Sequence, residues 1–501
     1  MNNNILKLKE PLLKFAYDQM VEDPRDGLSL FGPFDKGKVT DFTIGIIGTV
    51  AGRKRMKSWL KKAHGPVYHP TADIAKPFFP GFSATFDVSF NIDNIVELDV
   101  NPETLSLFYR YVDNHQRVSN IVDLYVDGLV AYRKEEEIKV DLWFIVIPDY
   151  VYTVCRPKSR VPKKDGIKIG ISDDYSRRNV GLFEDPETEK LRSAYYYENH
   201  FHNQLKIKLL KHSILTQIVR ESTIAYNDFL KPTGKPKKDL SQFETAIAWN
   251  ISTALYYKIG GLPWKLGNVR EGVCYVGLVF KNDETNKDNR IACCAAQMFL
   301  DSGDGLVFKG AVGPWYNPEN YQYHLSKESA KELLSMSIKG FEKRNNRRPK
   351  EIFIHGKTFF SEEEWEGFLE AAGNDTKIFG IRITSEKYFK LFREGDFPVL
   401  RNSALVTGKN SAFLWTKGFI PRLQSVLGLE TPNPLNIQIV RGDANIVTVC
   451  QDVLALTKLN YNTCIFGDGM PVTLKFADRI GEILTAGPNE NLEVLPFKYY
   501  I

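Results

Sequence analysis

Four polar side chains near the middle of the sequence have the types and the spacing that can bind a phosphate group. His202 and Lys206 are four residues apart, and Gln217 follows eleven residues after Lys206. Lys258 comes two residues before a pair of glycines, in NISTALYYKIGGLPWKL. Ammonium groups supply positive charge, whereas an imidazole and an amide supply directed hydrogen bonds. Together these residues predict a site for a terminal phosphate.

Two helices and a strand must position these side chains. A helix predicted over residues 202–212 places His202 and Lys206 on one face, because an α-helix repeats about every 3.6 residues. Gln217 then opens a short apolar run that is typical of a strand. A second predicted helix ends at Lys258, where two glycines and a proline stop it. Taken alone, that lysine could equally complement the dipole at an ordinary helix end.

The order of these residues resembles the motif in the MID domain of Argonaute proteins that holds the 5′-phosphate of a guide strand. Further segments, spread over essentially the whole chain, resemble short prokaryotic Argonautes. Within that group the sequence is similar to the SPARTA type, which is encoded beside a TIR-APAZ protein. The segments are DPRDGLSLFGP (23–33), PFFPGF (77–82), GVCYVGLVF (272–280), ACCAAQMFLDSGDG (292–305), GPWYNPE (313–319), LTKLNYNTC (456–464) and the terminal FKYYI.

The resemblance implies an α/β protein with two lobes. We expect a mixed α/β amino-terminal extension at residues 1–130, packed on a Rossmann-like MID lobe at residues 131–268. An RNase H-like PIWI lobe should follow at residues 269–501. The hydrophobic pattern agrees, since predicted helices and strands alternate through the MID segment and three strand candidates then follow in succession.

The second lobe also carries signals for two capped helices. Ser326 precedes a run with apolar residues at helical spacing. Ser361 and Glu364 form a capping-box pattern before another helix, and Gly373 is a plausible stop for it. A strand is predicted between the two helices, at residues 351–355.

An RNase H-type active site requires several carboxylates that hold two divalent cations about 4 Å apart. By resemblance, Val279 stands where slicing Argonautes have the first aspartate of the set. Gly356 stands at the second position, although a shift of one residue would place Lys357 there. Asp478 is retained, but one carboxylate cannot hold two cations, and this acid also suits the first turn of a helix. We therefore expect a catalytically inactive protein.

Other metal sites have weak support in the sequence. Asp283, Asp301 and Asp304 are close in sequence, but Asp-Ser-Gly-Asp-Gly at residues 301–305 is typical of a hairpin turn. The six cysteines form no CxxC pair, and the eight histidines are scattered without an HExxH motif. Neither a zinc site nor a disulfide framework is expected.

The sequence ends in FKYYI, with Ile501 as its last residue. In proteins similar to this one, the terminal carboxylate folds back toward the junction of the MID and PIWI lobes, near a cation held with the guide phosphate. A carboxylate repels a phosphate unless a Mg²⁺ ion or a lysine lies between them. The resemblance therefore implies that Ile501 binds Mg²⁺ together with the guide phosphate.

The formal net charge of +5 is too small to argue for nucleic acid by itself, but three local stretches are basic. Such stretches can neutralise phosphates, or they can be solvated loops. They consist of Arg53, Lys54, Arg55, Lys57, Lys61 and Lys62; of Arg156, Lys158, Arg160, Lys163 and Lys164; and of Lys231, Lys235, Lys237 and Lys238.

Length and composition indicate a globular protein of two or three domains. The chain has 501 residues, of which 43% are hydrophobic and 25% are charged. No uninterrupted apolar stretch approaches about 18 residues, the length typical of a membrane span. The amino terminus lacks the apolar segment and cleavage site of a secretory signal. We expect a cytoplasmic protein.

The resemblance implies a catalytically inactive short Argonaute that binds a 5′-phosphorylated guide RNA and pairs it with single-stranded target DNA. It further implies a TIR-APAZ partner that degrades NAD(P) once target is bound, as a defence against plasmids or phage. The two chains would form a heterodimer that assembles into a higher oligomer.

Three alternatives remain at this stage. The partner could carry a sirtuin-type or nuclease effector fused to APAZ in place of TIR. The chain could be an active RNase H-like nuclease that uses an unaligned acid. It could also be a self-contained α/β protein that binds a nucleotide or another small phosphate.

Overall fold

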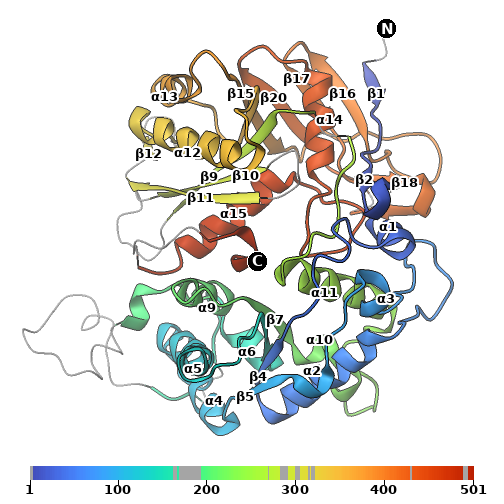
Figure 1. Ribbon diagram of the computed structural model, residues 1–501, viewed down its shortest axis with the longest axis vertical. Helices are drawn as coiled ribbons and strands as arrows, with labels where there is room; N and C mark the ends of the chain where they lie inside the picture. Colours follow the sequence, from blue (N-terminus) through green and yellow to red (C-terminus); the bar gives the residue numbers. More distant parts are fainter. Residues whose placement is uncertain are drawn as a thin grey trace, which may run out of the picture.

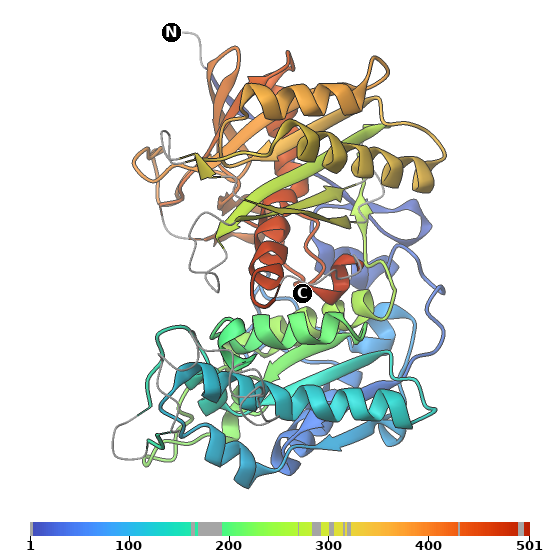
Figure 2. The same cartoon turned by 90° about the vertical axis from the view of Figure 1, so that its left-hand side faces the viewer.

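The computed structural model describes residues 4–161, 166–168, 193–268, 270–282, 292–299, 305–313, 316–317, 322–428, 431–488 and 495–501. These residues form two α/β lobes, which lie one above the other in Figure 1. Figure 1 and Figure 2 both show the carboxyl-terminal residues between the lobes. The predicted α/β class with two lobes is confirmed.

The lower lobe in Figure 1 is built on a parallel sheet of four strands in the order β5-β4-β6-β7. Every residue of β4 and β6 is buried, because helices cover both faces of the sheet. This is the Rossmann-like arrangement that the sequence predicts. The strands are β4 (Ile44–Gly48), β5 (Val96–Asp99), β6 (Leu142–Ile147) and β7 (Thr216–Arg220).

Two helices pack on each face of this sheet. One face carries α2 (Val50–His64) and α11 (Glu244–Lys258), and the other carries α5 (Asn114–Glu135) and α9 (Phe201–Leu210). Shorter helices complete the lobe: α3 (Phe82–Phe86), α4 (Pro102–Phe108), α6 (Asp149–Val154) and α10 (Glu221–Ile224).

The boundary predicted at residue 130 is wrong, because it falls within α5. The segment before it supplies β4 and β5, which are two of the four strands of the sheet. A strand in the middle of a sheet cannot be separated from its neighbours without breaking main-chain hydrogen bonds. Most of the predicted extension is therefore an integral part of the lower lobe.

The upper lobe is built on a mixed sheet of nine strands in the order β1-β16-β17-β20-β15-β14-β9-β10-β11. Its central strands β9, β14 and β15 run parallel, and the flanking pairs are antiparallel. The strands are β1 (Ile5–Lys7), β9 (Val273–Asn282), β10 (Ala292–Phe299), β11 (Gly305–Gly313), β14 (Glu351–Gly356), β15 (Lys377–Ser385), β16 (Ser403–Gly408), β17 (Ser411–Leu414) and β20 (Leu435–Arg441).

Helices cover both faces of the nine-stranded sheet. One face carries α12 (Lys327–Asn345) and α13 (Glu362–Ala372), and the other carries α14 (Ile446–Leu456) and α15 (Val472–Leu484). Two short hairpins lie outside this sheet. They consist of β12 (Tyr316–Asn317) with β13 (Gln322–Tyr323), and of β18 (Gly418–Ile420) with β19 (Ser425–Leu427).

Both predicted helix caps in this lobe are present. The Ser326 hydroxyl accepts a hydrogen bond from the amide of Ser329 at 3.3 Å, and the Ser361 hydroxyl accepts one from the amide of Glu364 at 3.2 Å. The capping box at Ser361 is only half formed, because the buried Glu364 carboxylate accepts from the amide of Leu325 at 3.2 Å.

The first residues of the chain connect the two lobes. β1 joins the edge of the nine-stranded sheet beside β16. β2 (Leu13–Lys14) then pairs with β3 (Met20–Val21) on one side and with β8 (Lys265–Leu266), in the segment that links the lobes, on the other. α1 (Pro24–Phe31) follows, and the Asp23 side chain caps it. The extension therefore contacts both lobes and does not pack on the MID lobe alone.

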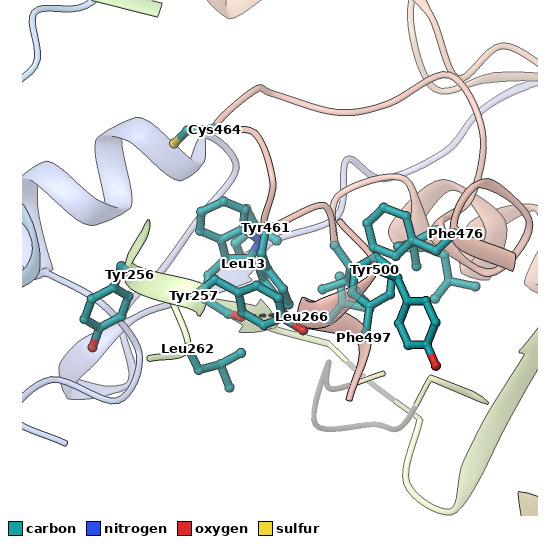
Figure 3. Close-up of a cluster of buried hydrophobic side chains, with 14 of the residues drawn as sticks. Leu13, Tyr256, Tyr257, Leu262, Leu266, Tyr461, Cys464, Phe476, Phe497 and Tyr500 are labelled. Atoms are coloured by element: carbon teal, nitrogen blue, oxygen red, sulfur yellow. Dashed lines mark hydrogen bonds between the residues drawn. The ribbon is translucent and has the colours of Figure 1, made fainter. Parts of the chain in front are cut away.

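A single hydrophobic core also spans the junction of the lobes (Figure 3). Tyr257, at the end of α11, packs against Tyr461 of the upper lobe with ring centroids 4.8 Å apart. Phe476 of α15 stacks on Phe497 at 3.9 Å. Phe497 begins the 3₁₀ turn Phe497–Tyr499, so the carboxyl-terminal segment is part of this core. None of the described helices is long and apolar enough to cross a bilayer.

Candidate phosphate-binding site at the junction of the lobes

Lys206 lies inside the protein on α9, at the side of the lower lobe that faces the upper lobe. Its side chain is 2% exposed. The ammonium group donates hydrogen bonds to the main-chain oxygen of Thr216 at 3.0 Å and to that of Ile501 at 2.6 Å. Burial lowers the pKa of Lys206 to about 7, because the charged form loses its hydration.

Lys258 is positioned by the end of α11, where the two glycines form the predicted stop. The Gly261 amide donates to the oxygen of Tyr256 at 3.0 Å, and the Gly260 amide donates to that of Tyr257 at 3.2 Å, a Schellman motif. Gly260 has a φ of 110°, and a Cβ on Gly261 would lie 2.3 Å from the Tyr256 ring. Both positions therefore require glycine.

The Lys258 side chain is fully buried, and all three of its N–H groups donate. They bind the main-chain oxygen of Thr216 at 2.9 Å, the Oε1 atom of Gln217 at 2.7 Å and the main-chain oxygen of Ile501 at 2.6 Å. Burial, and after it the charge of Lys206, holds the pKa of Lys258 well below its ordinary value.

The two ammonium groups share the oxygens of Thr216 and Ile501, so two buried positive charges lie side by side. Such a pair is unfavourable unless an anion accompanies it, and the Ile501 oxygen that both groups bind belongs to the terminal carboxylate. The structure thus brings together Lys206, Gln217, Lys258 and Ile501 of the predicted set. Thr216 could not be found from the sequence, because it contributes a main-chain atom.

His202 lies beside this cluster and does not bind the shared oxygens. Its Nδ1 atom lies 3.0 Å from Oδ1 of Asn203. Desolvation of the ring and then the charge of Lys206 lower the pKa of His202 to about 3, so the imidazole is neutral at pH 7. His202 and Gln217 line a neighbouring cavity of about 300 Å³.

The sequence reading missed the aromatic and cationic wall of this cavity. Tyr152 of α6 lines it, and the guanidinium groups of Arg156 and Arg220 lie over the Tyr152 ring at 3.4 and 4.0 Å from the centroid. Arg156 belongs to a predicted basic stretch and follows Tyr152 by four residues, but nothing in the sequence connects the two with Arg220 at the end of β7. The wall offers a flat ring and two positive charges next to the lysine pair.

The residues aligned with the RNase H site lie on the upper lobe. Val279 is buried in β9. A Cβ on Gly356 would point to Phe360, on the far face of the sheet from α15. The alternative residue Lys357 reaches the site, since its Nζ atom lies 3.0 Å from Oδ1 of Asp478. Gly356 is therefore the wrong choice of the two, because side chains alternate between the faces of a strand.

Asp478 binds a second lysine that the sequence reading did not identify. The Nζ atom of Lys281, near the end of β9, lies 3.0 Å from the same Oδ1 atom. Both lysines keep the pKa of Asp478 below its ordinary value, although burial opposes them. Asp478 stands in the middle of α15 rather than in its first turn, so the reading as a helix N-terminal acid is wrong.

Most cations of the first basic stretch are paired within the lower lobe. They lie on α2 and are not a free surface for phosphates, contrary to the expectation from sequence. The pairs are Arg53–Glu97, Arg53–Asp99, Arg55–Glu221, Arg55–Asp228, Lys57–Glu97 and Lys62–Glu244. The third stretch is different, because its four lysines are exposed on the turn before α11.

Two other sequence predictions fall outside the described residues. These are the hairpin turn with Asp283, Asp301 and Asp304, and the end of the second basic stretch with Lys163 and Lys164. Within the part of the chain that the structure describes, no three His, Cys, Asp or Glu side chains gather as a metal site.

The sequence and the fold were compared with those of known proteins. No protein-family model and no curated protein matches the sequence. Solved structures do match over almost the whole chain. Clostridium butyricum Argonaute bound to a guide DNA and a 19-mer target DNA matches with a TM-score of 0.62 and 15% identity, over 98% of this chain and 54% of that chain.

Two further structures match in the same way. Drosophila Piwi has a TM-score of 0.59 and 11% identity, over 99% of this chain and 56% of its own. A. aeolicus Argonaute has a TM-score of 0.54 and 13% identity, over 97% of this chain and 54% of its own. The chain has an Argonaute fold. It spans about half the length of each of these structures.

In this Argonaute fold the lysine pair binds Ile501, and Figure 2 shows the carboxyl terminus between the two lobes. Asp478 lies on α15, the helix of the upper lobe that faces the lower lobe in Figure 1. Both clusters therefore face the space between the two halves of the Argonaute fold.

Proposed function

We propose that this chain binds the 5′-phosphate of a guide RNA and uses the guide to recognise complementary single-stranded DNA. The observation that carries the proposal is the pair of buried, adjacent ammonium groups of Lys206 and Lys258 at the lobe junction of an Argonaute fold. Base pairing reads the target sequence, while the protein recognises phosphate, backbone and duplex shape.

The guide phosphate takes hydrogen bonds that the two lysines otherwise give to Ile501. Because the phosphate is negatively charged, it raises the pKa of Lys206 and of Lys258 and keeps both protonated in the complex. The Gln217 amide rotates to donate its N–H to a phosphate oxygen. Phosphorylated guides are therefore preferred over guides with a 5′-hydroxyl.

Mg²⁺ is the cation that we propose beside the guide phosphate. The site offers oxygen atoms of the kind that Mg²⁺ prefers, on the Gln217 side chain and at the end of Ile501. The ion supplies positive charge between the Ile501 carboxylate and the phosphate, which otherwise repel each other. Chelation of Mg²⁺ with EDTA is expected to weaken binding of a phosphorylated guide, with little change for a 5′-hydroxyl guide.

The first guide base fits the neighbouring cavity of about 300 Å³. There it stacks on the guanidinium plane of Arg156 or Arg220, which cover the Tyr152 ring and also supply positive charge to its phosphodiester. His202 is neutral, so it acts as a hydrogen-bonding group and not as a cation.

We further propose that the chain does not cut its target. Val279 and Gly356 carry no metal ligand, and the retained Asp478 is bound by two lysines instead of metal ions. The rival is an RNase H-like nuclease that uses another acid. Incubation of the guide-loaded chain with labelled target and Mg²⁺ or Mn²⁺ tests this directly, since any guide-dependent product would refute inactivity.

A partner chain completes the proposed function. The segments that resemble the SPARTA group support a TIR-APAZ protein that degrades NAD(P) when target DNA is bound, in defence against plasmids or phage. Target pairing then shifts the heterodimer toward an active oligomer. A sirtuin-APAZ or nuclease-APAZ partner is the alternative, and the adjacent reading frame distinguishes the three.

A competition experiment separates guide binding from binding of a small phosphate compound. The chain is incubated with a labelled 5′-phosphorylated RNA and an equal concentration of a free nucleoside monophosphate. We expect the RNA to stay bound, because the lobes also contact its backbone. Displacement of the RNA by the nucleotide would favour a self-contained small-phosphate site.

A further inference from the structure

Lys281 and Lys357 form a second cationic cluster around Asp478, on the upper lobe. Lys281 is the ninth residue of β9, and Lys357 directly follows the end of β14. These two strands are parallel neighbours in which Leu278 pairs with Gly356. Because their carboxyl ends meet at one edge of the sheet, both ammonium groups reach the same Oδ1 atom of Asp478, at 3.0 Å each.

This cluster does not fit a pair of divalent metal ions. A two-metal site needs several carboxylates that converge on the cations. At Asp478 one carboxylate faces two ammonium groups, and Glu482 lies 3.3 Å from Lys281. Lysines therefore occupy the carboxylate oxygens that a pair of divalent cations would need. The positive charge that metal ions supply in an RNase H-like site is thus built into the chain itself.

The lysines also keep hydrogen-bond donors for a ligand. Among the described residues, Lys357 contacts only Asp478, and its side chain is 45% exposed. Two of its three N–H groups therefore have no partner among these residues. Lys281 is 26% exposed and uses two donors, on Asp478 and Glu482.

A cleft leads from this cluster to the lower lobe. It has a volume of about 580 Å³ and is lined by Lys281, Arg479 and Glu482 of the upper lobe and by His200 and Asn203 at the start of α9. The helix α9 also carries Lys206. His200 lines both this cleft and the cavity of about 300 Å³ beside the lysine pair, so the cluster and the proposed guide site are neighbours.

We propose that Lys281 and Lys357 bind a backbone phosphate of the target strand, at the place where a slicing enzyme would hold the scissile phosphate with metal ions. This inference rests on the proposed function, since it requires a target strand paired with the guide. Asp478 positions the two lysines and competes with the phosphate for them. The degenerate site then serves as a metal-free sensor of a correctly placed duplex.

The test compares targets in which one phosphodiester is replaced by an uncharged methylphosphonate. The full chain is loaded with a 5′-phosphorylated RNA guide, and its affinity is measured for complementary DNAs that carry the replacement at successive positions. We expect one position to weaken target binding about 5- to 20-fold, the range for one charged hydrogen-bonded contact. When the guide is bound before the measurement, this loss of target affinity should be the same in EDTA and in Mg²⁺.

Substitutions assign that position to the two lysines. In Lys281→Gln with Lys357→Gln, target binding should fall by a similar factor and the sensitive position should disappear. Guide binding should be unchanged. The matched control is Lys409→Gln. Lys409 lies on the turn between β16 and β17, is exposed and pairs with Asp443, so its substitution should not change target binding.

Asp478→Asn gives a result of opposite sign. Loss of the carboxylate frees both ammonium groups, so target binding should become several-fold tighter at the same linkage. A purely structural ion cluster predicts weaker binding, and that result would overturn the proposal.

A wild-type protein that binds guide and target but shows no sensitive linkage would also overturn it, without affecting the guide site. Failure to bind a phosphorylated guide would overturn the proposed function and this site together.

Discussion

Lys206 and Lys258 each place an ammonium group against the main-chain oxygens of Thr216 and Ile501. An exposed lysine has a pKa of about 10.4 and carries its charge at every physiological pH. Burial changes this, because it lowers the pKa of Lys206 to about 7 and that of Lys258 well below its ordinary value. Both ammonium groups therefore lose their charge more readily than an exposed lysine does, and an anion that binds them favours the charged form.

A pH dependence of guide recognition follows from these values. Phosphate binds the protonated lysines, so binding takes up protons when the pH lies above the pKa of about 7 of Lys206. The preference for a 5′-phosphate should fall by up to about 50-fold between about pH 7 and about pH 9, because the protonated fraction of a group with a pKa of about 7 falls from about one half to about one hundredth. Affinities of 5′-phosphorylated and 5′-hydroxyl guides, measured in parallel across this range, check the prediction. A constant ratio would show that the lysines are already charged.

At the scale of elements, the end of α11 decides where Lys258 lies. The Schellman motif requires Gly260 in a left-handed conformation and leaves no room for a side chain on Gly261. This part of the site could be predicted from sequence, because two adjacent glycines followed by a proline are a local signal. The wall of Tyr152, Arg156 and Arg220 could not, since only the fold brings Arg220 of β7 to the end of α6.

Gly261→Ala should damage both the fold and the site. The new Cβ would lie 2.3 Å from the Tyr256 ring, so the last turn of α11 must shift and carry Lys258 with it. We expect a loss of about 1–3 kcal/mol in the free energy of unfolding, as for other overpacked positions. Urea unfolding measures this loss, and the preference for phosphorylated guides should decrease as well.

Gly65→Ala is the matched control for this substitution. Gly65 ends α2 with a φ of −101°, and a Cβ there meets nothing within 4 Å. The free energy of unfolding of the Gly65→Ala variant should differ from that of the wild type by less than about 0.5 kcal/mol. Equal effects of the two substitutions would mean that the close contact at Gly261 is not what holds the end of α11.

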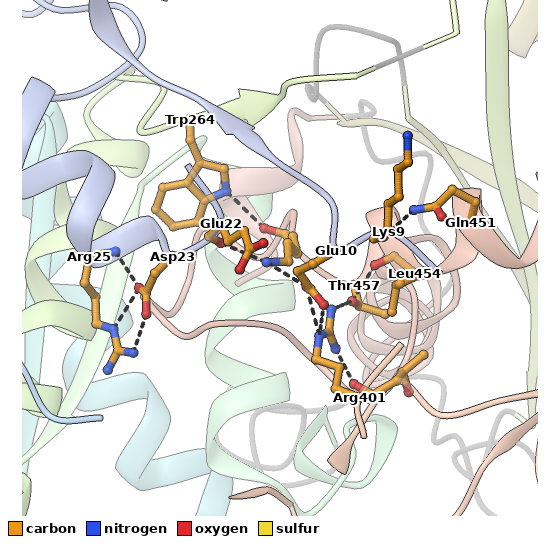
Figure 4. Close-up of polar contacts among 12 residues, drawn as sticks. Lys9, Glu10, Glu22, Asp23, Arg25, Trp264, Arg401, Gln451, Leu454 and Thr457 are labelled. Atoms are coloured by element: carbon orange, nitrogen blue, oxygen red, sulfur yellow. Dashed lines mark hydrogen bonds and ion pairs between the residues drawn. The ribbon is translucent and has the colours of Figure 1, made fainter. Parts of the chain in front are cut away.

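At the scale of the whole molecule, the amino-terminal residues connect the lobes through a buried ion cluster (Figure 4). Glu10 lies 3.0 Å from Arg401 and 2.9 Å from Lys458, whose ammonium group also donates to the main-chain oxygen of Glu22 at 2.8 Å. All three charged side chains are almost fully buried. The cluster attaches the first strands of the chain to the upper lobe.

Glu10→Gln should destabilise the protein strongly. Removal of the carboxylate leaves two buried cations without a counter-charge, which costs about 3–5 kcal/mol in comparable cases. Urea or thermal unfolding measures the change. Asp18→Asn is the control. The Asp18 side chain is 82% exposed, so its ion pair with Lys14 should contribute less than about 1 kcal/mol to the free energy of unfolding. A loss at Glu10 no larger than at Asp18 would contradict this role.

Long-range contacts set the limit of the sequence predictions. Local hydrophobic runs located β6, β7, β9, β10, β11 and β14, and spacing located the phosphate-binding lysines. The boundary at residue 130 failed because β4 pairs with β6, almost a hundred residues later, and no local pattern reports that pairing. Lys281 was missed for the same reason, since only the fold brings β9, β14 and α15 to one carboxylate.

Guide discrimination by the lysine pair tests the central claim most directly. Affinities for 5′-phosphorylated and 5′-hydroxyl forms of one RNA are compared in the wild-type chain, in Lys206→Met with Lys258→Met, and in Lys208→Met. Methionine keeps the length of the side chain but removes its charge. Lys208 is the control, because it lies on the same helix but pairs with Asp123 at 2.6 Å, away from the site.

The wild type and Lys208→Met should prefer the phosphorylated guide by about 100-fold, as expected for two charged hydrogen-bonded contacts. The double variant should bind both guides with nearly equal, weak affinity. A double variant that still prefers the phosphate, or that loses affinity for both guides by the same factor, would contradict a phosphate site at Lys206 and Lys258.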